Sequence, residues 1–147
     1  MIGNNFTATS EITINKNVKD VWHALTDARL AREYMFGASV TTDWKEGSSI
    51  IWEGEWESKK FKDKGTILKA VPNSLLQYSH YSPLSGASDV PENYHTVTIK
   101  LNAETDDIRV VLTQDGNADK EAMIHSQKNW DLVLAKLKQL VETSQQV

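Results

Sequence analysis

The C-terminal stretch of the chain limits most strongly what it can fold into. From Ala118 to Glu142, one set of residues recurs at steps of three and four: Met123, Gln127, Trp130, Val133, Leu134, Leu137 and Val141. An α-helix turns by roughly 100° per residue, so these side chains fall within one arc. The spacing predicts an amphipathic helix that Asn117 caps, roughly 38 Å long at about 1.5 Å per residue. Such a helix must lie across an apolar surface, which only the preceding segments can supply.

Length and composition exclude several classes of protein. The 147 residues suit one domain that spans residues 1–147. The chain has 16 basic and 20 acidic residues and no long basic stripe, which argues against nucleic-acid binding. It has no cysteine, which excludes disulfides, thiolate metal sites and cysteine nucleophiles. The N-terminus lacks a signal-peptide pattern and no apolar run approaches the roughly 20 residues of a membrane span, so we expect a cytoplasmic protein.

The period of the apolar residues changes along the chain before this helix. Residues 6–15 alternate as in a strand, the stripe that follows predicts a short helix, and Asp27 can cap a second helix over residues 28–35. The period is then two, which predicts strands over residues 40–43, 49–57, 65–71, 75–81, 94–102 and 108–114. The lysine-rich residues 58–64 are predicted as a hairpin tip. Residues 82–93, with two prolines, a glycine and several serines, are predicted as a loop without helix or strand.

This order of elements predicts an α+β domain. Helices that are segregated from consecutive antiparallel strands are typical of α+β rather than alternating α/β proteins. A sheet of about six to seven strands twists strongly enough to curl around one long helix. We therefore expect a curved antiparallel sheet wrapped around the C-terminal helix, with two short helices after the first strand.

Short motifs spread along the chain carry a resemblance to a known family. They are Val21 to Thr26 (VWHALT), Asp43 to Gly47 (DWKEG), Asp63 to Leu68 (DKGTIL), Leu112 to Gln114 (LTQ), and Asn129-Trp130 with Val133, Leu134, Leu137, Lys138 and Glu142. In this order and spacing the chain resembles the START-like, or SRPBCC, superfamily, whose helix-grip fold is that of the birch pollen allergen. More narrowly, it is similar to the bacterial single-domain homologues of the activator of heat-shock-protein-90 ATPase.

The resemblance implies a hydrophobic pocket between the sheet and the long helix without fixing how that pocket is used. Related domains bind lipids, polyketides or hormones, or act as co-chaperones, and a shared fold does not select among these functions. In the eukaryotic activators a separate N-terminal domain supplies much of the contact with the chaperone. This chain resembles only the C-terminal domain, so a chaperone partner is an alternative hypothesis.

The candidate ligand-binding residues are side chains predicted to face this pocket or its mouth. They are Tyr34, Phe36, Trp52, Trp56, Tyr78, His80, Gln127, Trp130 and Leu134. Aromatic rings supply contact area and a few polar groups fix orientation, which suits a flat apolar ligand with one or two hydrogen-bonding groups. Residues 82–93 would form either a lid over the mouth or a plain surface loop. The aromatic stripe would equally suit a filled core, so the sequence leaves an open cavity and a filled core as alternatives.

We expect the chain to bind a small hydrophobic or aromatic molecule, lipid-like or polyketide-like, without catalysis and without a cofactor. Its four histidines show no paired metal spacing, and it has no phosphate-binding or nucleophile motif. An enzyme of the cyclase or hydrolase type would need His80 and a nearby carboxylate as acid and base. A protein-interaction domain would use Ile124 and Leu132 on the polar side of the long helix, and the sequence allows a monomer or a homodimer.

Overall fold

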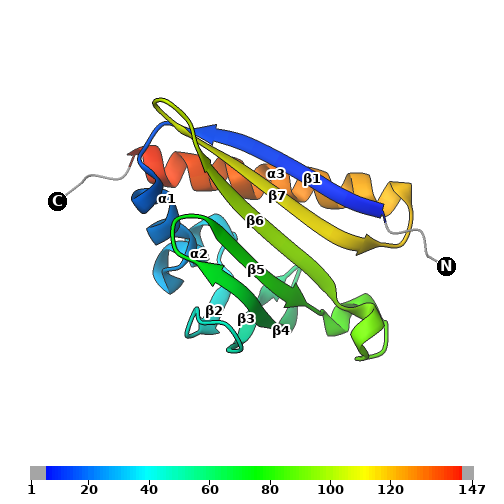
Figure 1. Ribbon diagram of the computed structural model, residues 1–147. Helices are drawn as coiled ribbons and strands as arrows, with labels where there is room; N and C mark the ends of the chain where they lie inside the picture. Colours follow the sequence, from blue (N-terminus) through cyan, green and yellow to red (C-terminus); the bar gives the residue numbers. More distant parts are fainter. Residues whose placement is uncertain (1–5, 144–147) are drawn as a thin grey trace.

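A curved antiparallel sheet and one long helix make up most of the fold (Figure 1). The computed structural model describes residues 6–143. The strands are β1 (Phe6–Ile14), β2 (Ser39–Thr42), β3 (Ser49–Trp56), β4 (Lys59–Val71), β5 (Leu75–His80), β6 (His95–Ala103) and β7 (Ile108–Asn117). The helices are α1 (Val18–Leu25), α2 (Ala28–Tyr34) and α3 (Lys120–Thr143), with short 3-10 turns η1 (Pro83–Ser85) and η2 (Pro91–Asn93).

The seven strands form one antiparallel sheet in the order β1-β7-β6-β5-β4-β3-β2. Consecutive strands from β2 to β7 are neighbours, and β1 closes the order by pairing with β7. The long helix α3 lies across one face of this sheet, while α1 and α2 sit beside one end of it (Figure 1). The predicted α+β class and helix-grip arrangement are therefore confirmed, including the two short helices after the first strand.

The core lies between the sheet and the inner face of α3. Its helix side consists of Val133, Leu134, Leu137 and Val141, each at most 9% exposed. Its sheet side includes the fully buried Ile14, Ile50 and Val110. Because burial of one such side chain stabilises a fold by roughly 1.5–3 kcal/mol, this stripe fixes the rotation of α3 about its axis.

The long helix begins later than the sequence predicts. Its N-cap is Asp119, whose Oδ1 accepts from the Ala122 amide at 2.8 Å, and the prediction of Asn117 as the cap is wrong. Asn117 is buried as the last residue of β7, where its Nδ2 donates to the Phe6 carbonyl at 2.8 Å. The side chain is thus used to join β7 to β1, and its Oδ1 accepts from Ser126 Oγ at 2.7 Å.

The far end of α3 is also fastened to β1. Glu142 Oε2 accepts from the Asn15 amide and from Lys138 Nζ, both at 2.7 Å, and Lys138 donates to the Thr13 carbonyl at 2.6 Å. The bond from the Asn15 amide, followed by that from Lys138, holds the pKa of the Glu142 carboxyl below its usual value. The helix is therefore held across the sheet at both ends.

The hairpin between β3 and β4 is tighter than the sequence predicts. Residues 58–64 do not form a hairpin tip, because β4 starts at Lys59 and the turn consists of Glu57 and Ser58, both with positive φ. The lysines of this run lie on a charged face of the strand, where Lys60 stands opposite Glu55 and Lys62 opposite Glu53. Such opposite-charge pairs stabilise a sheet, so a lysine-rich run here is compatible with a strand.

Residues 82–93 are partly helical, contrary to the prediction that they contain no helix. They hold the turns η1 and η2, and each turn starts with a proline. Proline fits the first position of a helical turn because its fixed φ suits the turn and its missing N–H is not needed there. The prolines that argued against a helix therefore start these turns.

Candidate functional site

Side chains from four neighbouring strands form one row on the face of the sheet that α3 covers. Trp52 of β3 is the direct partner of Asp63 in β4, and His80 of β5 is the direct partner of His95 in β6. A hydrogen bond of 3.0 Å between His80 Nε2 and Asp63 Oδ2 connects the two pairs. We call Trp52, Asp63, His80 and His95 the transverse row.

A cavity of about 300 Å³ lies between the transverse row and the N-terminal half of α3. The strands line it with Trp52, Tyr78, His80, His95, Val97 and Gln114, α3 with Ser126, Asn129, Trp130 and Val133, and the remaining lining is Met35, Ser82, Ser85 and Asn93. Ligand sites commonly measure about 300–1,000 Å³. The space is therefore at the small end of what binds a drug-sized molecule.

Aromatic rings form the deep wall of this cavity. The rings of Trp52 and Tyr78 lie 6.2 Å apart at 46°, and both residues are almost fully buried. Burial raises the pKa of the Tyr78 hydroxyl well above its usual value, so this group stays a hydrogen-bond donor. Within residues 6–143, two buried polar groups have no hydrogen-bond partner. They are the indole N–H of Trp52 and Oδ1 of Asp63, its partner on β4. Each such group costs about 1–3 kcal/mol of stability.

The opposite wall is fixed by a bond between α3 and β7. Trp130 Nε1 donates to Gln114 Oε1 at 2.5 Å. This contact sets the orientation of the Gln114 amide, because its oxygen must face the indole. The amide nitrogen of Gln114 then has no acceptor in the part of the chain that the structure describes. It is a hydrogen-bond donor of the cavity lining, as the Tyr78 hydroxyl is.

The two histidines of the transverse row are each held by one ring nitrogen. His80 uses Nε2 toward Asp63, and His95 uses Nδ1 toward the Asp115 carbonyl at 2.9 Å. A carbonyl only accepts, so Nδ1 of His95 carries the hydrogen. The carboxylate that the enzyme hypothesis requires beside His80 is thus Asp63.

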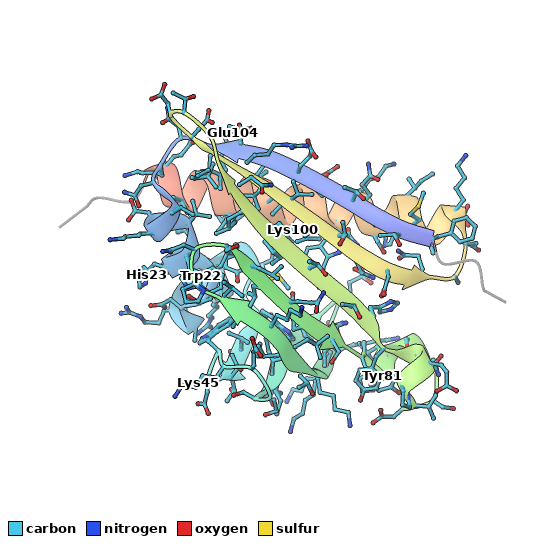
Figure 2. The ribbon with its side chains drawn as sticks, viewed as in Figure 1. Trp22, His23, Lys45, Tyr81, Lys100 and Glu104 are labelled. Atoms are coloured by element: carbon cyan, nitrogen blue, oxygen red, sulfur yellow. The ribbon has the colours of Figure 1, made fainter. Side chains whose placement is uncertain are left out.

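The loop of residues 82–93 covers one end of the cavity and is firmly anchored. Tyr81, labelled in Figure 2 at this end of the sheet, donates to the Ala87 carbonyl at 2.6 Å and stacks on Tyr94 with ring centroids 5.2 Å apart. Asp89 accepts from Lys64 and from Tyr94, both at 2.6 Å. The bonds from Lys64 and Tyr94 lower the pKa of the Asp89 carboxyl. Within this fold the loop is a fastened cover over the cavity.

A wider groove of about 920 Å³ lies outside the cavity. The segment after α2, the β3–β4 hairpin and α3 line it, and Phe36 and Leu132, each 60% exposed, lie along it. Met35, Asn129 and Val133 line both the groove and the cavity. The two spaces are therefore neighbours, separated by these three side chains.

Comparison with protein families identifies the chain. The family model described as "Activator of Hsp90 ATPase homolog 1-like protein" matches residues 15–142. The chain belongs to this family. The resemblance found in the sequence is thereby confirmed, together with the START-like helix-grip fold. A search of curated proteins found no match.

Solved structures of family members and of more distant proteins share the fold. The solution structure of ChR145 from Cytophaga hutchinsonii is 48% identical, covers 92% of this chain and 93% of its own, and has a TM-score of 0.81. MLL2253 from Mesorhizobium loti is 20% identical over 95% of this chain and 99% of its own, with a TM-score of 0.79. The Aha1 dimer from Colwellia psychrerythraea is 17% identical over 95% of this chain and 98% of its own, with a TM-score of 0.74. The last two show likeness of fold alone.

The structure brings four of the nine predicted site residues together. Trp52, Tyr78, His80 and Trp130 all line the cavity. In this family member the alternation of β3 and β5 and the helical period of α3 direct these side chains to one space. Among the described residues, no cluster of three metal-ligating side chains and no helix able to cross a membrane is found.

The other predicted site residues lie elsewhere or are not described. Tyr34 and Leu134 are buried in the core outside the lining, and Tyr34 donates its hydroxyl to the Leu25 carbonyl at 2.8 Å. Phe36 lies on the outer groove, and Gln127 is exposed. The side chain of Trp56 lies outside the part of the structure that is described.

Sequence reasoning missed three polar residues of the site. Asp63 lies in the segment predicted as a hairpin tip, although Phe61, Asp63 and Gly65 alternate with lysines as in a strand. His95 alternates with Val97, which signals the same face of β6. Gln114 was placed at the end of a predicted strand, and only the structure shows that it meets Trp130.

Proposed function

We propose that this protein binds a small hydrophobic or aromatic molecule, lipid-like or polyketide-like, in the cavity between the sheet and α3. One observation carries the proposal: a space of about 300 Å³ lies inside the fold, where its wall includes Trp52, Tyr78 and Trp130. Ligand sites are concave spaces of about 300–1,000 Å³ lined mostly by apolar and aromatic side chains with a few polar groups. Membership of a family with a START-like fold supports the same function.

The lining matches a flat molecule with a few polar groups. The ring faces offer contact area at low entropic cost, and aromatic pairs add specific geometry. The polar side chains of the lining include the imidazoles of His80 and His95 and the amide of Gln114. Such convergent polar groups in an apolar pocket fix the orientation of a ligand.

The test is an amide NMR titration with fatty acids, sterols, flavonoids and polyketide-like aromatics. We expect saturable shifts at Tyr78, at Val97 and at the Trp130 indole N–H, whose acceptor Gln114 lines the same cavity. Gln77 and Thr98 are the internal control, because they lie on the same strands but on the opposite face of the sheet. A panel without saturable shifts, or shifts equal on both faces, would contradict the proposal.

Protein interaction is the second candidate function, and the outer groove is the observation that favours it. Phe36 and Leu132 are large apolar side chains left exposed beside a groove of about 920 Å³. Exposed apolar side chains mark a partner surface where they form a contiguous patch. A chaperone or a second copy of the chain would dock there, and the relative from Colwellia psychrerythraea is a dimer.

The substitution Leu132→Lys separates this candidate from ligand binding. If the groove joins two copies, the wild-type protein has the mass of a dimer in light scattering and the variant has that of a monomer. Ligand binding in the cavity should be unchanged, because Leu132 does not line it. A mass that is the same for both proteins would exclude self-association through this groove.

A further inference from the structure

We propose that His80, backed by Asp63, acts as a base toward the bound molecule, so that the cavity takes aromatic or enolic hydroxyl compounds as their anions. The proposal rests on the proposed function and deepens it, since it names the chemical class of the ligand. Its basis is the placement of two imidazoles in one wall of the cavity, with the Asp63 carboxylate bonded to His80 at 3.0 Å.

Strand register holds the two imidazoles beside the same space. His80 and His95 are direct partners across β5 and β6, an arrangement in which Cβ atoms lie about 4.5–5.5 Å apart. Both residues line the cavity. A ligand oxygen in this part of the cavity therefore lies next to both rings.

Each imidazole has one nitrogen left for the ligand. The other nitrogen bonds to an oxygen that only accepts, the Asp63 carboxylate for His80 and the Asp115 carbonyl for His95. In the neutral rings the lone pairs are consequently on His80 Nδ1 and His95 Nε2. Neither atom has a hydrogen-bond partner within residues 6–143. The wall thus presents two acceptors to a ligand O–H group.

The carboxylate of Asp63 lies behind His80, 3.0 Å from its Nε2. Asp63 stabilises the imidazolium that forms, as a carboxylate does behind the histidine of a catalytic triad. The side chains that α3 contributes to the lining are Ser126, Asn129, Trp130 and Val133, and all are uncharged. The helix therefore supplies no carboxylate to repel an anion in the cavity.

Two donors in the lining suit the oxygen of the anion. The Tyr78 hydroxyl stays protonated because burial raises its pKa, and the Gln114 amide nitrogen has no acceptor in the described part of the chain. The carboxylate of Asp115, the next charged group along β7, accepts from the Thr96 amide at 2.6 Å. Hydrogen bonds to an oxyanion are about twice as strong as those between neutral groups.

The proton transfer involves only the ligand and the protein. The O–H bond of the ligand breaks, an N–H bond forms at His80 Nδ1, and the electron pair stays on oxygen as a phenolate or enolate. The proton returns to the oxygen when the ligand leaves, so no further reactant is needed. A purely apolar ligand of the same shape gains none of this energy.

The test compares para-nitrophenol with its methyl ether para-nitroanisole, which has no acidic proton. The phenol and phenolate forms of para-nitrophenol have different absorption bands. The measurement is made one pH unit below the pKa of para-nitrophenol, where about nine-tenths of the free compound is protonated. We expect the phenolate band to grow as wild-type protein is added, in proportion to the bound fraction from equilibrium dialysis. The ether should bind at least tenfold more weakly.

Three variants locate the base. His80→Gln should reduce the phenolate band per bound ligand at least tenfold, and Asp63→Asn should have a smaller effect in the same direction. His23→Gln is the matched control: His23 also faces a carboxylate, Asp27 at 3.7 Å, but it is 66% exposed on α1, far from Tyr81 (Figure 2). It should behave as wild type. Amide spectra of all variants check the fold.

The outcomes separate this proposal from the proposed function. The proposal that His80 acts as a base is wrong if para-nitrophenol binds in its neutral form, or if the phenolate band survives both His80→Gln and Asp63→Asn. Either result leaves the proposed ligand binding intact. The same proposal is wrong if para-nitrophenol fails to bind while other aromatic compounds bind in the cavity. If no compound of either test binds, the proposed function itself is wrong.

Discussion

The substitution Gly65→Ala should destabilise the sheet and the site together. A Cβ atom at Gly65 would lie 1.7 Å from the backbone oxygen of Ser79 on β5. Carbon and carbonyl oxygen approach to about 3.3 Å at the closest, so β4 and β5 would have to separate by roughly 1.6 Å. Because the obstacle is backbone, no side-chain rotation can relieve it.

The expected loss of stability follows from the hydrogen bonds beside Gly65. The Lys64 and Tyr81 backbones exchange two hydrogen bonds of 3.0 and 2.8 Å, and the Thr66 amide donates to Ser79 Oγ at 2.9 Å. At about 1 kcal/mol each, their loss costs about 3 kcal/mol. Alanine also makes the unfolded chain stiffer than glycine does, which offsets this loss by about 0.4–1 kcal/mol. A net loss of roughly 2–3 kcal/mol lowers Tm by roughly 5–10 °C in a domain of this size.

Urea unfolding and thermal melting measure this loss, with Gly54→Ala as the matched control. A Cβ atom at Gly54 would meet the Phe61 ring at 2.8 Å, but a half-buried ring can turn away, so the cost should be about 1 kcal/mol or less. The variant Gly65→Ala should also weaken the bond between His80 and Asp63, two residues along β4. Equal stability of the two variants would refute the close approach of β4 and β5.

Two further predictions concern the bonds that frame the cavity. Trp130→Phe keeps the ring but leaves Gln114 Oε1 without its donor, so the free energy of unfolding should fall by about 1 kcal/mol in urea titrations. The pKa of Asp89 is lowered in the folded state, so its contribution to stability is present above the ordinary carboxyl value of 3.8 and is lost as pH falls through the lowered value. The protection factors of the 82–93 amides against hydrogen exchange should therefore fall below that range, and Asp89→Asn should abolish this fall.

Periodicity was sufficient to predict most of the fold. The aliphatic positions Val133, Leu134 and Leu137 carry a strong helical signal, and strand alternation is equally clear where one face is apolar. It failed over residues 58–64, where Phe61 is the one apolar side chain among polar ones. The N-cap was misplaced because Asn117 is a good cap by type, and only its bonds in the sheet show that it is already used.

The sequence predicts the direction in which a site residue points, but not how far its side chain lies from the sheet. Alternation placed Trp52 and Tyr78 on the inner face, and both line the cavity. A helical wheel gives the direction of a side chain and not its distance from the sheet, which is why Gln127 is exposed while Leu134 is packed. The partner of His80 comes from another strand, so it depends on register, which a single sequence does not fix.

The central claim is that the space beside Val97 is open, and one pair of variants tests it without knowledge of the ligand. Val97 lines the cavity, whereas Val110 is fully buried outside it. Overpacking a filled core costs about 1–3 kcal/mol, so Val110→Phe should lose at least this much in urea unfolding. Val97→Phe should stay within about 1 kcal/mol of wild type, because its ring enters a space of about 300 Å³. An equal loss for both variants would show that the core is filled and contradict a binding cavity.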